Sequence, residues 1–139
     1  MHITVRDDYA VQAMLAIAAD GGGPVKTIEM ATRQNIPVTY LPPILTDLRN
    51  AELITSRQGS DGGYSLARPA TDITVGDIMR AVSGPLSSIR RMPPDTVTYD
   101  GAATSLPGLW AALRHTTHQL LDSTTLHDLL HGEGSATAA

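Results

Sequence analysis

The stretch LITSRQGSDGGYSLAR, from Leu53 to Arg68, decides the fold of this chain of 139 residues. Its two ends, Leu53–Arg57 and Gly63–Arg68, have the two-residue periodicity of short strands. The glycine, serine and aspartate residues between them have the composition of a tight, exposed turn. The stretch therefore predicts a β-hairpin, and the elements before and after it identify the fold.

Two helices are expected before the hairpin. Residues 9–19, YAVQAMLAIAA, are apolar at almost every position, and a helix that is apolar nearly all round is buried. We therefore expect this helix to be the spine of the core and to stop at Gly21–Pro24. Thr27 is placed to cap a second, short helix, Ile28–Gln34, which ends in a turn at Asn35.

A third helix is expected directly before the hairpin. Its apolar side has helical spacing and it ends near Asn50; that side consists of Leu41, Ile44, Leu45 and Leu48. Proline is tolerated only at the start of a helix, so regular helix should begin close to Pro42, after an irregular or 3₁₀ lead-in over Val38–Leu41. Three helices followed by a hairpin are the layout of a winged helix-turn-helix, in which the third helix enters a DNA groove.

The second half of the chain is predicted to be helical as well. Thr74 and Asp77 form a capping box before a helix that ends at Gly84-Pro85. A longer helix should run from Ser105 to about Leu121, and either Thr124 or Thr125 should cap a last short helix. The fold class is thus mainly α with a small β-hairpin wing, a winged helix-turn-helix plus a long helix.

These elements suggest four parts of the chain. Residues 1–85 form the winged helix-turn-helix, and residues 86–104, which have no clear period and contain two adjacent prolines, form a loop. Residues 105–132 form the C-terminal helices, and residues 133–139 form a tail of small residues that is expected to be disordered.

Composition excludes several classes of function. The 139 residues contain no cysteine, which rules out disulfides, thiolate nucleophiles and cysteine-ligated zinc or iron–sulfur clusters. No secretory signal is visible at the N-terminus, and no apolar run approaches the roughly 18 residues that a membrane span needs, so a cytosolic location is expected. No nucleophile elbow, phosphate loop or paired-carboxylate motif is present, so we predict that the protein is not an enzyme.

Charge argues mildly against nucleic acid. Residues 1–68 hold six lysines and arginines against seven acidic residues, and residues 69–139 hold four against seven. A DNA-binding protein usually has a basic surface. If this chain binds DNA, a few arginines on one face must form that surface.

The candidate DNA contacts lie around the third helix and in the hairpin. Arginine can bind phosphate or guanine, and hydroxyl and amide groups can meet phosphates or base edges. On this basis the predicted contacts are Thr39, Tyr40, Arg49, Arg57, Gln58 and Ser60. The alternatives are an ordinary solvated hairpin, or a winged helix that binds another protein and has lost DNA binding.

Four histidines occur late in the chain, and their spacings of three and four residues place each pair on one helical face: His115, His118, His127 and His131. Such spacing suits a metal ion but arises readily by chance, and no carboxylate-rich pocket accompanies it. We therefore expect solvated or interface histidines and no metal or other cofactor.

Several longer motifs resemble the Rrf2 family of bacterial repressors. They are YAxxAxLAIA in the first helix, YLxxILxxLRxAxLI in the third, GGYxLARP at the end of the hairpin and IxxxDIxRAVxGPL after it. Trp110 and the TLxDLL motif extend the resemblance toward the C-terminus. The resemblance implies a DNA-binding repressor that binds a palindromic operator.

The resemblance also implies a homodimer in which the long penultimate helix crosses its partner. The apolar stripe that fits this role consists of Leu106, Leu109, Trp110, Leu113 and Leu120. Packing of the same stripe within one chain is the alternative.

This chain departs from the family pattern in three places. Sensing members hold an iron–sulfur cluster through three cysteines in the loop before the long helix, whereas this chain has none and resembles the cluster-free branch. Gln58 stands where a basic residue often precedes the wing glycine, and Asp61 adds negative charge. Pro42-Pro43 changes the start of the third helix. These departures suggest modest affinity or an unusual operator.

An effector, if one exists, is expected between this loop and the long helix. The candidate residues there are Arg90, Arg91 and Tyr99, which could hold a small molecule or anion. A protein effector is the alternative.

Overall fold

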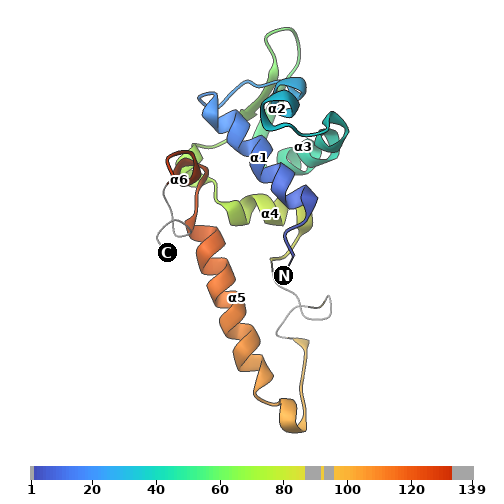
Figure 1. The fold of residues 1–139 in the computed structure, drawn as a ribbon, viewed down its shortest axis with the longest axis vertical. Coiled ribbons are helices and arrows are strands. Elements are labelled where there is room, and N and C mark those ends of the chain that lie inside the picture. Colours follow the sequence, from blue (N-terminus) through green and yellow to red (C-terminus); the bar gives the residue numbers. More distant parts are fainter. Residues whose placement is uncertain (1, 87–91, 93–95, 133–139) are drawn as a thin grey trace.

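The computed structural model describes residues 2–86, 92 and 96–132 (Figure 1). It is mainly helical with one antiparallel hairpin, which confirms the predicted fold class. The elements in chain order are α1 (Val5–Ala19), α2 (Thr27–Gln34), the 3₁₀ turn η1 (Val38–Tyr40), α3 (Leu41–Asn50), β1 (Ile54–Arg57), β2 (Gly63–Leu66), η2 (Ala70–Asp72), α4 (Val75–Ser83), η4 (Gly101–Ala103), α5 (Leu106–Ser123) and α6 (Leu126–Leu130).

Helix α1 begins at Val5 and not at residue 9, so the predicted start was wrong by about one turn. Thr4 caps it through a capping box with Asp7, whose carboxylate accepts a hydrogen bond from the Thr4 N–H at 3.0 Å. The buried Asp7 also accepts a hydrogen bond from the hydroxyl of Ser83 at the end of α4. The first turn of α1 could not be predicted from apolar spacing, because its acidic residues cap the N-terminus of the helix and do not belong to an apolar stripe.

The N-cap of α2 is Lys26 and not Thr27, which is the first helical residue. The Lys26 N–H donates to the Glu29 carboxylate at 3.3 Å, so a side chain inside the helix satisfies this end without a capping hydroxyl. Asn35 ends the helix in the left-handed region, with φ of 53°, as the turn prediction required.

The lead-in to the third helix is as predicted. Val38–Tyr40 form the 3₁₀ turn, and α3 begins at Leu41 with Pro42 and Pro43 in its first turn. The apolar side of α3 is buried against the core, and its opposite side is exposed.

The hairpin pairs Ile54 with Leu66 and Arg57 with Gly63, in the antiparallel sense. A third segment that the sequence did not predict joins it, because Val25 exchanges two backbone hydrogen bonds with Tyr64, at 2.9 and 2.8 Å. Gly63 makes this close approach possible, since a Cβ at that position would lie 2.7 Å from the Val25 carbonyl. The wing is therefore anchored to the strand-like segment before α2.

The core lies between α1 and the elements around it. Its centre is α1, in which Ala10, Ala13, Met14 and Ile17 are fully buried, as expected of the spine. Helices α2, α3, α4 and α6, the hairpin and the segments that connect these elements contribute most of the remaining apolar side chains. Leu126 of α6 is fully buried in the same cluster, so the last helix packs on α1.

Helix α5 differs from all these elements. It extends away from the winged-helix body, with η4 near its far end (Figure 1). None of its 18 residues is buried. At its C-terminal end Thr125, and not Thr124, caps α6 through a capping box with Asp128. The tail, residues 133–139, lies outside the described residues, as does much of the predicted loop over residues 86–104.

Candidate nucleic-acid interface

The six predicted contact residues lie at the two ends of α3 and on the hairpin that follows it. Thr39 and Tyr40 belong to η1, Arg49 lies near the end of α3, and the hairpin carries the rest: Arg57, Gln58 and Ser60. All six side chains are exposed. Helix α3 packs directly against β1, so the helix and the wing form one continuous part of the molecule.

Aromatic packing holds the start of α3 in place. The ring of Tyr40 contacts that of Tyr9 on α1 edge to face, with centroids 5.1 Å apart and an interplanar angle of 83°. Such a contact favours one ring orientation. Tyr40 is thus positioned from the core while it remains exposed to a partner.

Ion pairing changes the charge that this face presents. The Asp47 carboxylate on α3 pairs with the guanidinium of Arg6, which also donates from Nε to the Val82 carbonyl at 3.1 Å. The negative charge of Asp47 on α3 is therefore neutralised by a residue of α1.

The unpaired cations gather in the winged helix. Within the described ranges, four basic side chains pair with carboxylates: Arg6, Arg33, Arg68 and Arg80. The other described basic side chains have no carboxylate partner: Lys26, Arg49, Arg57 and Arg114. Three of these four lie in the helix-turn-helix and wing, so an acidic chain can still present positive charge there.

Lys26 is an exposed cation at this candidate interface that the sequence prediction did not include. It is exposed and follows Val25, which pairs with the wing residue Tyr64. The long-range pairing brings Lys26 beside the hairpin, and nothing local in the sequence signals this. Its position at the N-terminus of α2 was the available hint, because phosphate groups bind at such ends.

Two glycines shape the tip of the wing. Gly59 has φ of +103°, and its carbonyl accepts a hydrogen bond from the Gly62 N–H at 3.1 Å. A Cβ at Gly62 would overlap the Arg57 carbonyl. The tight turn projects Gln58 and Ser60 into solvent together with the acidic Asp61.

The proposed dimer stripe lies on α5. Leu109, Leu113 and Leu120 are 57%, 54% and 40% exposed, which is unusual for leucines at helical spacing. Leu106 and Trp110 are half-buried. The Trp110 indole N–H donates to the Tyr99 hydroxyl at 3.1 Å, which attaches the described end of the loop to α5. The other two effector candidates, Arg90 and Arg91, lie outside the described residues.

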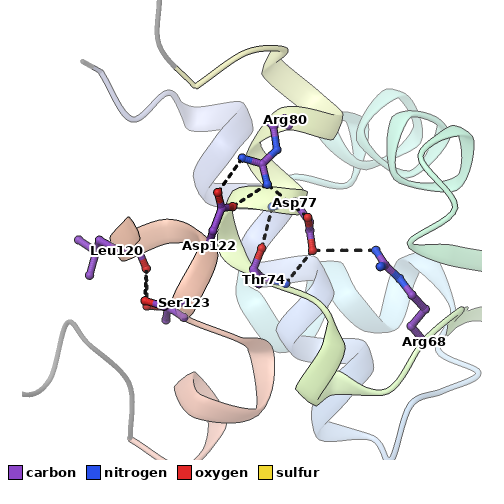
Figure 2. Close-up of polar contacts among 8 residues, drawn as sticks. Arg68, Thr74, Asp77, Arg80, Leu120, Asp122 and Ser123 are labelled. Carbon is purple, nitrogen blue, oxygen red and sulfur yellow. Dashed lines mark hydrogen bonds and ion pairs between the residues drawn. The ribbon is translucent and has the colours of Figure 1, made fainter. Parts of the chain in front are cut away.

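A polar network, the α4–α5 joint, attaches α5 to the body (Figure 2). The Arg80 guanidinium contacts the carboxylate of Asp122 at 2.6 Å and that of Asp77 at 3.3 Å. Arg68, after β2, lies 3.9 Å from the same Asp77. Gly76 makes room for this joint, because a Cβ there would overlap Asp122 Oδ1.

The joint also perturbs ionisation. Burial by itself raises the pKa of Asp77, but hydrogen bonds from Thr74 and Arg80 and the charge of Arg68 outweigh it, so this pKa lies below its ordinary value. The hydrogen bond to Asp122 raises the pKa of Arg80. Both groups are therefore held in their charged forms.

The described residues contain no group of three or more histidine, cysteine, aspartate or glutamate side chains arranged to hold a metal ion. The rings of His127 and His131 instead lie against each other, with centroids 4.2 Å apart. No helix in the described ranges combines the length and apolarity that crossing a bilayer demands.

Comparison with known proteins gives a consistent result. Residues 3–132 match the family model Rrf2, described as an iron-dependent transcriptional regulator. An HTH-type transcriptional regulator of Mycobacterium tuberculosis is 41% identical over 133 residues, which cover 95% of this chain and 83% of that protein. The regulator CymR of Bacillus subtilis is 33% identical over 130 residues, 93% of this chain and 89% of its own length.

Solved structures agree with the sequence comparison. The structure of CymR, the global cysteine regulator of B. subtilis, matches with a TM-score of 0.79 at 34% identity, over 93% of this chain and 95% of that one. The structure of IscR from T. potens matches with a TM-score of 0.74 at 34% identity, over 100% of this chain and 93% of that one. The named relatives are transcriptional regulators and not enzymes, in line with the prediction from sequence.

Proposed function

The chain belongs to the Rrf2 family of transcriptional regulators, and we propose that it is a homodimeric repressor that binds a palindromic operator. In this proposal η1 and the start of α3 enter the major groove, and the wing contacts phosphate or the minor groove.

The exposed apolar side of α5 carries the proposal of a dimer. An 18-residue helix with no buried residue and three largely exposed leucines leaves its stripe in water unless a partner covers it. Asp122, which faces α4, lies on the opposite side of the helical repeat from Leu113, so the stripe points away from the body. A second copy offers the same stripe, and two-fold pairing of identical surfaces is the commonest form of oligomer.

The exposed groups of the winged helix support DNA binding. Arg49 and Arg57 have no carboxylate partner and are free to meet phosphate, and Lys26 joins them beside the wing. The Thr39 and Tyr40 side chains can reach base edges from the first turn, while Gln58 and Ser60 can contact the backbone or the minor groove from the wing.

We propose that no cysteine-ligated iron–sulfur cluster takes part. Such clusters are held by thiolates, and this chain has none in its 139 residues. The residues therefore do not fit the cluster that sensing members of the family carry. An effector, if there is one, is a small molecule or a protein, and Tyr99 on α5's neighbouring segment is the described candidate for contact with it.

Fluorescence anisotropy tests the proposal. The purified protein is titrated against its own upstream intergenic DNA and against a shuffled duplex, at two salt concentrations. We expect sequence-dependent binding that weakens as salt rises, with one dimer bound per operator in sedimentation analysis. Sequence-specific DNA binding by a monomer would contradict the proposal of a homodimer.

The second candidate is a protein-interaction module, which the acidic balance, Asp61 and the two prolines of α3 favour. It predicts a stable dimer that shows no salt-sensitive association with either duplex.

A further inference from the structure

The first turn of the reading helix offers unusual chemistry to a DNA groove. Three apolar side chains are exposed there, one on η1 and two on α3: Val38, Pro42 and Pro43. Val38 is 44% exposed, although the residues that flank the turn on its inner side are buried. We name the exposed face formed by Val38, Pro42, Pro43 and Thr46 the apolar reading surface.

The segment from Tyr40 to Pro43, where α3 begins, has no free backbone donor. The start of a helix ordinarily leaves four N–H groups without partners. Here the Tyr40 N–H donates to the Pro37 carbonyl at 3.0 Å and the Leu41 N–H donates to the Val38 carbonyl, while Pro42 and Pro43 have no N–H. Residues Tyr40–Pro43 at the N-terminus of α3 therefore cannot hold a phosphate or a base acceptor through their backbone, as a helix start often does.

Thr46 adds an apolar contribution to the same face. It lies four residues after Pro42, one helical turn along, and it is exposed. Its hydroxyl donates to the Pro42 carbonyl at 3.0 Å, so the donor is used within the helix. The groups that remain for a partner are the methyl group and the lone pairs of the hydroxyl oxygen.

We propose that the apolar reading surface recognises thymine methyl groups in the major groove of the operator, an inference that rests on the proposed DNA-binding function. The C5-methyl of thymine is the apolar group that distinguishes one base there, and aliphatic side chains contact it. Cytosine opposite Val38 or Pro42 would instead place its amino donor against an aliphatic side chain that cannot accept a hydrogen bond, which leaves that donor unpaired. Val38 and Pro42 thus select thymine by contact and by exclusion, without a hydrogen bond.

The test starts from an operator selected by the protein from random duplex DNA. Each thymine of a half-site is then replaced by deoxyuridine, which lacks only the methyl group. We expect at least one position where affinity falls about fourfold, and about fifteenfold when both half-sites are changed, the value of one buried methyl in each. Selective binding with no response to uracil at any position overturns this inference and leaves the proposed function intact. Failure to select any duplex overturns both.

Variants identify the residue. Val38→Ala should weaken binding to the thymine operator and abolish most of the uracil effect at the sensitive position. Ile3→Ala serves as the matched control, because Ile3 is an exposed β-branched residue outside the helix-turn-helix. An unchanged melting temperature shows that Val38→Ala is folded, since the side chain is not part of the core. A full uracil effect in both Val38→Ala and Pro42→Ala contradicts the assignment.

Discussion

Helices α3 and α5 carry leucines at similar helical spacing, yet the leucines of α3 are buried and those of α5 are exposed. Leu41, Leu45 and Leu48 on α3 are at most 1% exposed, because α1, α4 and β1 cover them. Leu109, Leu113 and Leu120 on α5 are 40% to 57% exposed, because the described part of the chain does not fold back over them. An apolar stripe thus indicates that something covers a helix, but not whether the cover comes from the same chain.

The largest expected effect comes from breaking the α5 side of this comparison. Leu109→Asp with Leu113→Asp places charges in the proposed interface and should yield a monomer in sedimentation analysis. Operator affinity should fall at least about a hundredfold, because two linked half-site contacts become one. His115→Asp, on the opposite side of the helix, is the control and should remain dimeric. A dimeric double variant would mean that the stripe is not the interface.

In the winged helix, cations without a carboxylate partner should contribute more to operator affinity than cations in ion pairs. Arg57→Ala should weaken operator binding about tenfold and lower the slope of log affinity against log salt by about one. Arg33→Ala removes the same charge from a side chain already paired with Asp20 and Glu29, and it should have little effect. Anisotropy titrations over a salt series measure both. Equal losses in the two variants would contradict the view that pairing decides which cations meet DNA.

The α4–α5 joint can be probed with two glycines. Gly76→Ala and Gly108→Ala both gain helix propensity, but only the first forces a Cβ onto Asp122, while nothing lies within 4 Å of the second. Urea unfolding should therefore find Gly76→Ala less stable than Gly108→Ala by about 1 kcal/mol. In an Asp122→Ala background the difference should shrink. If the stability difference persists in the Asp122→Ala background, a clash with Asp122 is not the reason that Gly76→Ala is destabilising.

The smallest expected effect is a dependence of stability on pH. The pKa of Asp77 is lower in the folded protein than in the unfolded chain, so its ionised form stabilises the fold. This stability is present above the unfolded pKa of about 3.9 and is lost as pH falls through the folded value. Asp77→Asn should flatten the loss of stability between neutral and acidic pH in urea titrations. A variant profile parallel to the wild type would remove Asp77 from this account.

Several parts of the fold and of the candidate site were readable from local sequence. The capping box of Thr74 and Asp77, the 3₁₀ lead-in before Pro42 and the existence of the hairpin depend on residues within a few positions of one another. The same holds for the exposure of Arg57 and Ser60, because a tight turn with glycines projects its neighbours into solvent. Such features involve short-range hydrogen bonds and backbone preferences, which the order of residues determines directly.

Other features depended on contacts between distant segments. The pairing of Val25 with Tyr64 brought Lys26 to the wing, and Arg6 neutralised Asp47 across 41 positions of sequence. Arg80 met Asp122 only because Gly76 let α5 approach α4. Local sequence was therefore enough to predict the main helices and the hairpin, apart from the first turn of α1, and to identify the 3₁₀ lead-in to α3 and the family. Tertiary structure decided which charges stay unpaired and which leucines stay exposed, because both depend on what another segment covers.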